Sequence, residues 1–208
     1  TLYEAYLHYV PRVVPRAPVR RLLRWHLRRY YEGVDAVMTP SDIGAEVLRK
    51  YGVRKPITPI RNPVLPFPAV SKAEARARLG VPEEVWMLLY VGRMAPEKNV
   101  SVLLEAMPHI VRGCPNARLW LVGPGPALES LRAEAEARQL TEWVQFTGPV
   151  PRDEVSLYLL AADLFVFPSV TESQGLVLDE AQAAGLPCIV ANGGGAPEAV
   201  DYGQTGLV

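Results

Sequence analysis

Leu164 to Glu198 reads LFVFPSVTESQGLVLDEAQAAGLPCIVANGGGAPE, a stretch in which apolar runs, polar turns and a helical pattern follow one another. The runs Leu164–Phe167 and Cys188–Ala191 show no alternation of polar and apolar side chains. Strands of this kind are buried on both faces, as in parallel sheets that are covered by helices. Between the two runs, Leu176–Ala184 has the spacing of a helix. The stretch therefore predicts a strand–helix–strand unit with parallel strands.

The same alternation continues toward the amino terminus as far as residue 87. Apolar runs of strand length are separated by stretches in which apolar residues recur at helical spacing. This order predicts an α/β fold, a Rossmann-like parallel sheet with helices on both faces. The further strands are expected at Met87–Gly92, Leu119–Val122 and Val144–Thr147, and the further helices at Val100–Val111, Ala127–Arg138 and Asp153–Ala161.

A proline-rich segment separates this region from the first part of the chain. Three prolines fall within Pro63–Pro68, and neither a helix nor a strand ladder continues through them. We therefore expect a linker and a domain boundary here, with residues 1–64 on one side of the boundary and residues 65–208 on the other. The first part is expected to contain short strands at Ala36–Thr39 and Ile57–Ile60, with a helix between them that ends near Lys50.

The composition of the 208 residues is that of a globular protein, with 49% apolar and 21% charged residues. The 22 basic and 22 acidic residues cancel, so no net charge favours a nucleic-acid partner. Two cysteines are too few for a disulfide scaffold or a four-cysteine zinc site. No apolar run approaches the ~20 residues of a membrane span, and Thr1–Val10 does not resemble a signal peptide. We expect a cytoplasmic protein.

The charge is nevertheless unevenly distributed along the chain. Residues 11–31 contain seven arginines and no acidic residue. From Val19 onward apolar residues recur at helical spacing, which predicts a basic amphipathic helix. Three interpretations remain open: peripheral binding to the anionic inner face of the cell membrane, a solvated surface helix, and nucleic-acid binding, which the neutral total disfavours. The apolar positions of this helix are Val19, Leu22, Leu23, Leu27 and Tyr30.

Glycines and charged residues follow each of the five predicted strands from residue 87 on. In an open parallel α/β sheet, ligands bind beyond the carboxyl ends of the strands. The loops at these ends therefore converge on one edge of the sheet, and we expect a ligand site there. The loops are Gly92–Lys98, Gly123–Pro126, Gly148–Val150, Pro168–Gly175 and Asn192–Glu198.

The residue types at this edge indicate a phosphorylated, hydroxyl-bearing ligand. Gly175 opens a helix whose first amides attract a phosphate, and Arg93 and Lys98 supply positive charge. Gly193–Gly195 would let a backbone approach an anion without a side chain in the way. Glu172 and Glu180 would repel a phosphate, so we expect these carboxylates to accept hydrogen bonds from hydroxyls. A diphosphate with hydroxyls indicates a nucleotide-sugar.

Six motifs carry a resemblance to a known family. Glu172 and Glu180 form a Glu-x7-Glu pattern, and the other five segments follow the order of the same family. The chain from about Val64 to Val208 resembles glycosyltransferase family 4, retaining enzymes of the GT-B fold in which two Rossmann-like domains face each other across a cleft. The other segments are Val91–Asn99, Leu121–Pro126, Phe146–Gly148 with Phe167–Ser169, and Gly194–Glu198.

The resemblance implies a role for each matching residue, and no bound metal ion or other cofactor. Arg93 and Lys98 would hold the donor diphosphate, and Glu172 would contact the transferred sugar as the catalytic residue that positions and stabilises it. Glu180 would bind the ribose hydroxyls. The backbone amides of Gln174, Gly175, Leu176 and Val177 would meet phosphate or sugar oxygens, and the loop from Gly148 to Val150 would lie near the base.

The amino-terminal residues narrow the acceptor that this resemblance implies. Thr1–Val10 resembles a segment of the bacterial diacylglycerol glucosyltransferases of the family. The implied function is transfer of a hexose from a nucleotide-sugar, UDP-glucose as the first expectation, to a lipid acceptor such as diacylglycerol. Two alternatives stay open: a GDP-mannose-dependent mannosyltransferase with a polysaccharide or soluble acceptor, and a nucleotide-sugar-binding module without catalysis.

The resemblance also implies that the chain is a fragment of a longer enzyme. Most of an amino-terminal acceptor domain would precede Thr1, and Gly206–Val208 resembles the start of a further strand in a truncated donor domain. A fragment of this kind is expected to be inactive by itself. The linker departs from the family pattern, because Pro63 stands where relatives commonly have a glycine and rules out a positive φ there.

Overall fold

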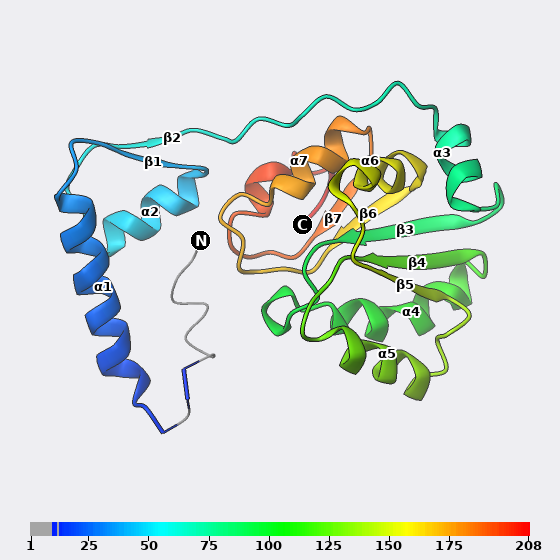
Figure 1. Cartoon of the computed structure of the whole chain (residues 1–208), viewed down its shortest axis with the longest axis horizontal. Helices are drawn as coiled ribbons and strands as arrows, with labels where there is room; N and C mark the ends of the chain where they lie inside the picture. Colours follow the sequence, from blue (N-terminus) through cyan, green and yellow to red (C-terminus); the bar gives the residue numbers. More distant parts are fainter. Residues whose placement is uncertain (1–9, 12) are drawn as a thin grey trace.

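The computed structural model describes residues 10–11 and 13–208, which form two parallel sheets. A two-stranded sheet near the amino terminus pairs β1 (Val37–Thr39) with β2 (Ile57–Pro59). An extended segment, residues 60–71, leads from it across to a six-stranded sheet, as Figure 1 shows. The resemblance noted at Thr1–Val10 lies almost wholly outside the described residues.

The six-stranded sheet has the strand order β5-β4-β3-β6-β7-β8, and every neighbouring pair is parallel. The chain starts at the central strand β3, adds β4 and β5 on one side, and then returns to add β6, β7 and β8 on the other. The order therefore reverses between β3 and β6, the place where doubly wound folds bind ligands. The strands are β3 (Trp86–Val91), β4 (Ala117–Val122), β5 (Val144–Gly148), β6 (Leu164–Phe167), β7 (Cys188–Val190) and β8 (Gly206–Leu207).

Helices cover both faces of this sheet. Figure 1 shows α4 (Ser101–Gly113) and α5 (Leu128–Ala137) on one side, and α6 (Arg152–Ala161) and α7 (Leu176–Ala183) on the other. Consecutive residues of the central strand are consequently buried, because each face meets a helix. This burial confirms the parallel α/β architecture that the uninterrupted apolar runs predicted.

One helix of this region was not predicted, α3 (Lys72–Leu79). Its sequence, KAEARARL, has almost no apolar stripe, and Ala75 and Arg76 are its buried residues. The residues that indicate a helix here lie at its two ends. The Ser71 hydroxyl accepts a hydrogen bond from the Glu74 amide at 3.2 Å, and Gly80 ends the helix in the left-handed conformation.

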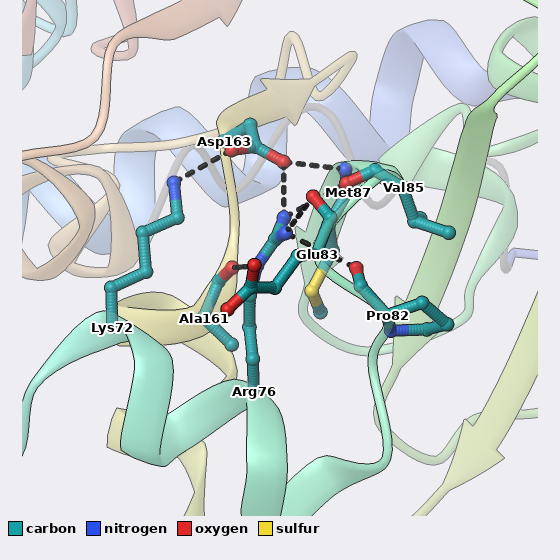
Figure 2. Close-up of polar contacts among 8 residues, drawn as sticks. All are labelled: Lys72, Arg76, Pro82, Glu83, Val85, Met87, Ala161 and Asp163. Atoms are coloured by element: carbon teal, nitrogen blue, oxygen red, sulfur yellow. Dashed lines mark hydrogen bonds and ion pairs between the residues drawn. The ribbon is translucent and has the colours of Figure 1, made fainter.

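A buried arginine fixes α3 against the sheet, as Figure 2 shows. The Arg76 guanidinium pairs with the Asp163 carboxylate at 2.6 Å, and the same carboxylate accepts the Met87 amide at 2.7 Å. Lys72 pairs with the other oxygen of Asp163 at 2.6 Å. These contacts lie where β3 and β6 begin, at the edge opposite the expected ligand site, so they are structural. Arg76 also donates to the carbonyls of Ala161, Pro82, Glu83 and Val85.

The amino-terminal part begins with the basic helix α1 (Arg16–Glu32) and continues with α2 (Asp42–Lys50) between the two short strands. We predicted that α1 starts at Val19, and this was wrong by three residues. Pro18 lies in the first turn of the helix, where the missing amide has no intrahelical acceptor to lose. A small core closes this part and consists of Val37, Ala45, Leu48, Val53 and Ile57.

The apolar face of α1 is narrower than its sequence predicts. Leu27 is buried, whereas Leu22 and Tyr30 are 63% and 65% exposed. Trp25 is also exposed, at 58%, among the arginines. The helix therefore presents both basic and large apolar side chains to its surroundings.

Candidate active site

A cavity of about 1120 Å³ opens at the carboxyl ends of the strands, where the strand order reverses. Its walls come from the end of β3, the first residues of α6 and α7, and the linker residues 65–68. The structure thus brings together most of the side chains that the sequence singled out. Those lining the cavity are Arg93, Lys98, Glu172, Gly175, Leu176, Val177 and Glu180.

Lys98 and Glu172 form an ion pair in the wall of this cavity. Lys98 ends the short 3₁₀ helix η2 (Pro96–Lys98) that follows β3, and Glu172 lies in the loop after β6. Both side chains are mostly buried, and the Ser169 hydroxyl donates a hydrogen bond to the same Glu172 oxygen at 3.0 Å. A charge-assisted pair with a further donor fixes the carboxylate.

Arg93 lines the cavity with a half-exposed side chain and already has an acidic partner. Its guanidinium pairs with the Glu97 carboxylate, which is itself almost completely buried. The Tyr90 hydroxyl donates a hydrogen bond to the Arg93 carbonyl at 3.3 Å. Burial, together with the nearby carboxylates of Glu172 and Glu97, raises the pKa of Tyr90 far above its ordinary value of 10.0, although Arg93 opposes the shift. Tyr90 therefore lines the cavity as a neutral hydrogen-bond donor.

The start of α7 presents backbone amides to the cavity. Gly175 precedes the helix with φ of 74°, a left-handed conformation that strongly favours glycine. The amides of the first helical turn, at Leu176 and Val177, have no carbonyl partner within the helix. Leu176 and Val177 line the same cavity as Lys98, so partial and full positive charges belong to residues around one cavity.

The glycines of the loop after β7 approach the protein's own backbone. A Cβ atom on Gly195 would lie 2.2 Å from the Ser173 carbonyl oxygen, and the Gly195 amide donates to the Glu172 carbonyl at 2.7 Å. We expected the missing side chains of Gly193–Gly195 to let the backbone approach an anion. In the structure they let this loop pack against the backbone of Glu172 and Ser173 and support it.

Glu180 lies further along α7 and faces α6. Its carboxylate accepts a hydrogen bond from Arg152 at 2.9 Å. Burial raises its pKa above the ordinary value of 4.5, with a further rise from Asp179, while Arg152 opposes the shift. Arg152 was not singled out from the sequence. Its position just after the Gly148–Pro151 turn, in the first turn of α6, was the available signal.

Three predicted residues lie outside the lining of the cavity. Gly148 ends β5, and Val150 packs with its side chain against the main core. The side chain of Gln174 is 3% exposed and bonds to Asn62 of the linker. The structure places none of these three side chains on the cavity wall.

A doubly wound sheet with paired cations and carboxylates at its switch point has the features of a sugar-nucleotide-binding domain. Residues 71–208 match the family model described as glycosyl transferases group 1, and the chain belongs to this family.

Three curated relatives are similar to the chain. Alpha-monoglucosyldiacylglycerol synthase of Streptococcus pneumoniae is 31% identical over 196 residues, which cover 91% of this chain and 44% of the relative. D-inositol 3-phosphate glycosyltransferase of Streptomyces bingchenggensis is 35% identical over 176 residues, which cover 78% of this chain and 39% of the relative. The GDP-mannose-dependent alpha-(1-6)-phosphatidylinositol monomannoside mannosyltransferase of Mycobacterium tuberculosis is 40% identical over 150 residues, which cover 69% of this chain and 38% of the relative. The chain thus spans less than half the length of these relatives.

Solved structures agree with the fold. Sucrose-phosphate synthase from Thermosynechococcus elongatus superposes with a TM-score of 0.81 at 28% identity, covering 100% of this chain and 52% of that one. Anabaena HepE in complex with UDP and glucose superposes with a TM-score of 0.76 over 88% of this chain and 53% of that one, and its 23% identity supports the fold alone. The expected α/β fold of the GT-B type is confirmed.

Two further features of the described residues bear on the site and its surroundings. Among residues 10–11 and 13–208, no three histidine, cysteine or acidic side chains gather in a way that would hold a metal ion. Of the helices in this described part, none is both long enough and apolar enough to cross a bilayer.

Proposed function

We propose that this chain forms the donor-binding part of a retaining glycosyltransferase that transfers a hexose from a nucleotide-sugar to a lipid acceptor. The observation that carries the proposal is the Lys98–Glu172 ion pair, which shares one cavity with the start of α7 and with Glu180. In this proposal residues 65–208 are the donor domain and residues 1–64 belong to the acceptor domain. The first donor and acceptor to test are UDP-glucose and diacylglycerol.

The positive groups around the cavity would bind the donor diphosphate. Lys98 and Arg93 supply full charges, and the first amides of α7 supply oriented dipoles. Each cation already pairs with a carboxylate, Lys98 with Glu172 and Arg93 with Glu97. A diphosphate would therefore share these cations, and Glu172 would become available to accept a hydrogen bond from the sugar.

Transfer breaks the bond between the anomeric carbon and the diphosphate oxygen, and forms a bond to the acceptor oxygen on the same face. The acceptor proton passes to the leaving diphosphate. Negative charge then grows on the diphosphate beside Lys98 and the α7 amides, and positive charge grows at the anomeric carbon near Glu172. Fixed charges at these positions stabilise the transition state more than the ground state.

The nucleoside end of the donor would lie toward α6. The Glu180 carboxyl is partly buried, has a raised pKa and is held by Arg152. A carboxylate in this setting suits hydrogen bonds from ribose hydroxyls better than contact with phosphate. The loop from Gly148 to Val150, beyond the lining of the cavity in this structure, would approach the base.

The basic helix α1 supports a lipid acceptor at a membrane surface. Its arginines and the exposed Leu22 and Trp25 combine the charge and apolar surface of helices that lie in the lipid interface. Two of the relatives carry diacylglycerol or phosphatidylinositol in their names. The proposed location is therefore cytoplasmic and peripheral, on the inner face of the cell membrane.

A thermal-shift panel with UDP, UDP-glucose, GDP and GDP-mannose tests the donor assignment, because a ligand of the folded state stabilises it by RT ln(1 + [L]/Kd). Stabilisation by the UDP compounds alone supports the first assignment. Stabilisation by the GDP compounds alone favours a mannosyltransferase, which the 40% identity to the mycobacterial enzyme supports. Binding without transfer of radiolabelled hexose by the intact enzyme would indicate a module without catalysis, and absence of any binding would contradict the proposal.

A further inference from the structure

The side chain of Gln174 connects the linker to the donor-binding helix. Its amide oxygen accepts hydrogen bonds from the Asn62 backbone amide at 3.2 Å and from Asn62 Nδ2 at 2.8 Å. Its amide nitrogen donates to the Asn62 carbonyl at 3.3 Å and to the Asp179 carboxylate at 2.7 Å. A glutamine amide can accept two hydrogen bonds and donate two. Gln174 makes all four, and its side chain is only 3% exposed.

The linker backbone is shaped to meet this amide. Pro63 disfavours helical conformations at the residue before it and holds Asn62 near an extended one. In an extended residue the N–H and C=O groups point to the same side, as they do in a strand pair. Asn62 therefore presents a donor and an acceptor together, and Gln174 binds both.

The contacts continue into α7. Asp179, which Gln174 holds, lies on the first turns of the helix and also attracts the Arg61 guanidinium at 3.5 Å. Two successive linker residues thus contact the loop before α7 and the helix itself. The α7 amides that line the cavity, at Leu176 and Val177, lie between these two attachment points.

A second contact joins the amino-terminal part to the same site. The Glu198 carboxylate accepts hydrogen bonds from the backbone amides of Asp42 and Ile43, at 3.1 and 2.6 Å, where α2 begins. Glu198 follows the glycine loop that packs against the backbone of Glu172 and Ser173. Residues before the linker and the linker itself are therefore both attached to the loops that carry the proposed donor contacts.

We propose that Gln174 and Asn62 form a clamp through which the linker positions the start of α7 for the donor. The proposal rests on the proposed function in one respect, that the α7 amides meet the donor diphosphate. Gln174 is a positioning residue, since it acts through Gly175 and the following amides. Coupling of this kind is reciprocal: donor binding strengthens the clamp by as much as the clamp strengthens donor binding.

Calorimetric titration of the 208-residue chain with UDP tests the clamp, with GDP used if the thermal-shift panel selects it. Gln174→Ala removes all four hydrogen bonds and is expected to weaken nucleotide binding by about tenfold or more. Asn62→Ala removes only the Nδ2 contact and is expected to weaken binding by about threefold. Gln145→Ala, at an exposed glutamine of β5, is the matched control and leaves the affinity unchanged.

Amide hydrogen exchange at Asn62 provides a readout that loss of structural stability alone would not produce. In the unaltered chain the Asn62 amide exchanges more slowly when nucleotide is bound, because its hydrogen bond to Gln174 is strengthened. In the Asn62→Ala variant the backbone contacts persist and the same slowing is reduced. This variant also keeps the test decisive if Gln174→Ala does not fold.

The two proposals fail in different ways. If the unaltered chain binds neither nucleotide, the proposed function fails and the clamp fails with it. If the unaltered chain binds nucleotide while both variants bind equally well, with exchange at Asn62 indifferent to nucleotide, the clamp alone is overturned. The clamp is supported if Gln174→Ala weakens nucleotide binding more than Asn62→Ala does, and if amide exchange at Asn62 depends on nucleotide.

Discussion

Lys98 and Glu172 lie 74 positions apart in the sequence and form an ion pair at the switch point of the sheet. Each comes from a loop that leaves one of the two strands between which the order reverses. In the proposed function a donor diphosphate would compete with Glu172 for this ammonium group, so donor binding and the position of the carboxylate would be coupled through Lys98. The pair gives the first two predictions, which separate binding from transfer.

Lys98→Ala is expected to weaken UDP binding by roughly tenfold to a hundredfold, since a hydrogen bond to a charged group contributes ~1.5–3 kcal/mol. Lys98→Arg keeps the charge and should retain part of the affinity. Isothermal titration calorimetry on the two variants measures the difference. Equal affinity in Lys98→Ala and the unaltered chain would remove Lys98 from the diphosphate site.

Glu172→Gln is expected to leave nucleotide affinity unchanged or slightly increased, because Lys98 loses a competing partner. Transfer by the intact enzyme should fall on the order of a hundredfold or more, since the charge that the proposal places beside the anomeric carbon is lost. A radiolabelled transfer assay beside a binding measurement separates the two effects. Transfer at the normal rate would refute the assigned role.

Glu180 predicts a dependence of stability on pH. Its pKa in the folded protein is raised, chiefly by burial, so the folded state holds this proton more tightly than the unfolded state does. The corresponding stabilisation is complete below the ordinary value of 4.5 and is lost as the pH rises through the folded pKa. Melting temperatures of the unaltered chain and of Glu180→Gln are compared from pH 4 upward (about the unfolded pKa), and that of the unaltered chain should fall relative to that of the variant as the pH rises through the folded pKa, because only the glutamate ionises. Parallel curves would contradict the shift.

Breaking the buried Arg76–Asp163 pair is expected to destabilise the fold without altering the site. Arg76→Ala leaves the Asp163 carboxylate without its most buried partner, and loss of one member of a buried pair costs ~3–5 kcal/mol. Lys72→Ala, at a half-exposed side chain on the same carboxylate, should cost less than ~1 kcal/mol. Urea unfolding measures both, and similar values for the two variants would show that Arg76 has no special role.

The basic helix predicts salt-sensitive membrane binding. Arg21, Arg28 and Arg29 are exposed, and each is expected to contribute ~1 kcal/mol at an anionic surface. Changing all three to glutamine should lower partitioning onto anionic vesicles by roughly a hundredfold, whereas Arg112→Gln on α4 should have little effect. Cosedimentation with vesicles measures this binding. A bound fraction that depends on neither the anionic lipid content nor the salt concentration would contradict this mechanism.

Local patterns in the sequence predicted most of the fold because its strands are buried on both faces. Leu164–Phe167 is apolar throughout, and the structure places β6 at the same residues. The helix α3 has no such pattern, because its buried Arg76 is polar and its partners at Pro82, Val85 and Asp163 are dispersed along the chain. Pro18 likewise made the predicted start of α1 three residues too late, since a proline in the first turn of a helix resembles a helix break when only the local sequence is considered.

The candidate site was predictable where residue type and strand-end position agree. Arg93, Lys98 and Glu172 are charged residues in loops that follow predicted strands. Glu180 lies on the predicted helix after the fourth of these strands, and all four residues line the cavity. Arg152 and Asn62 carried no comparable signal, because each is an ordinary polar residue until its partner is known. For Gln174 we expected a role only for the backbone amide, and the contacts of its side chain with Asn62 and Asp179 were not predicted.

The amino-acid sequence alone determined the parallel α/β architecture and the set of charged residues at one edge of the sheet. Burial on both faces and the common direction of parallel strands are properties that short stretches encode locally. Only the tertiary structure decided which of these residues pair, and which ones hold others in place. Lys98 meets Glu172, Arg152 meets Glu180 and Gln174 meets Asn62 because the chain reverses its strand order and returns the linker to α7. Such contacts depend on distances between segments far apart in sequence, which no local pattern specifies.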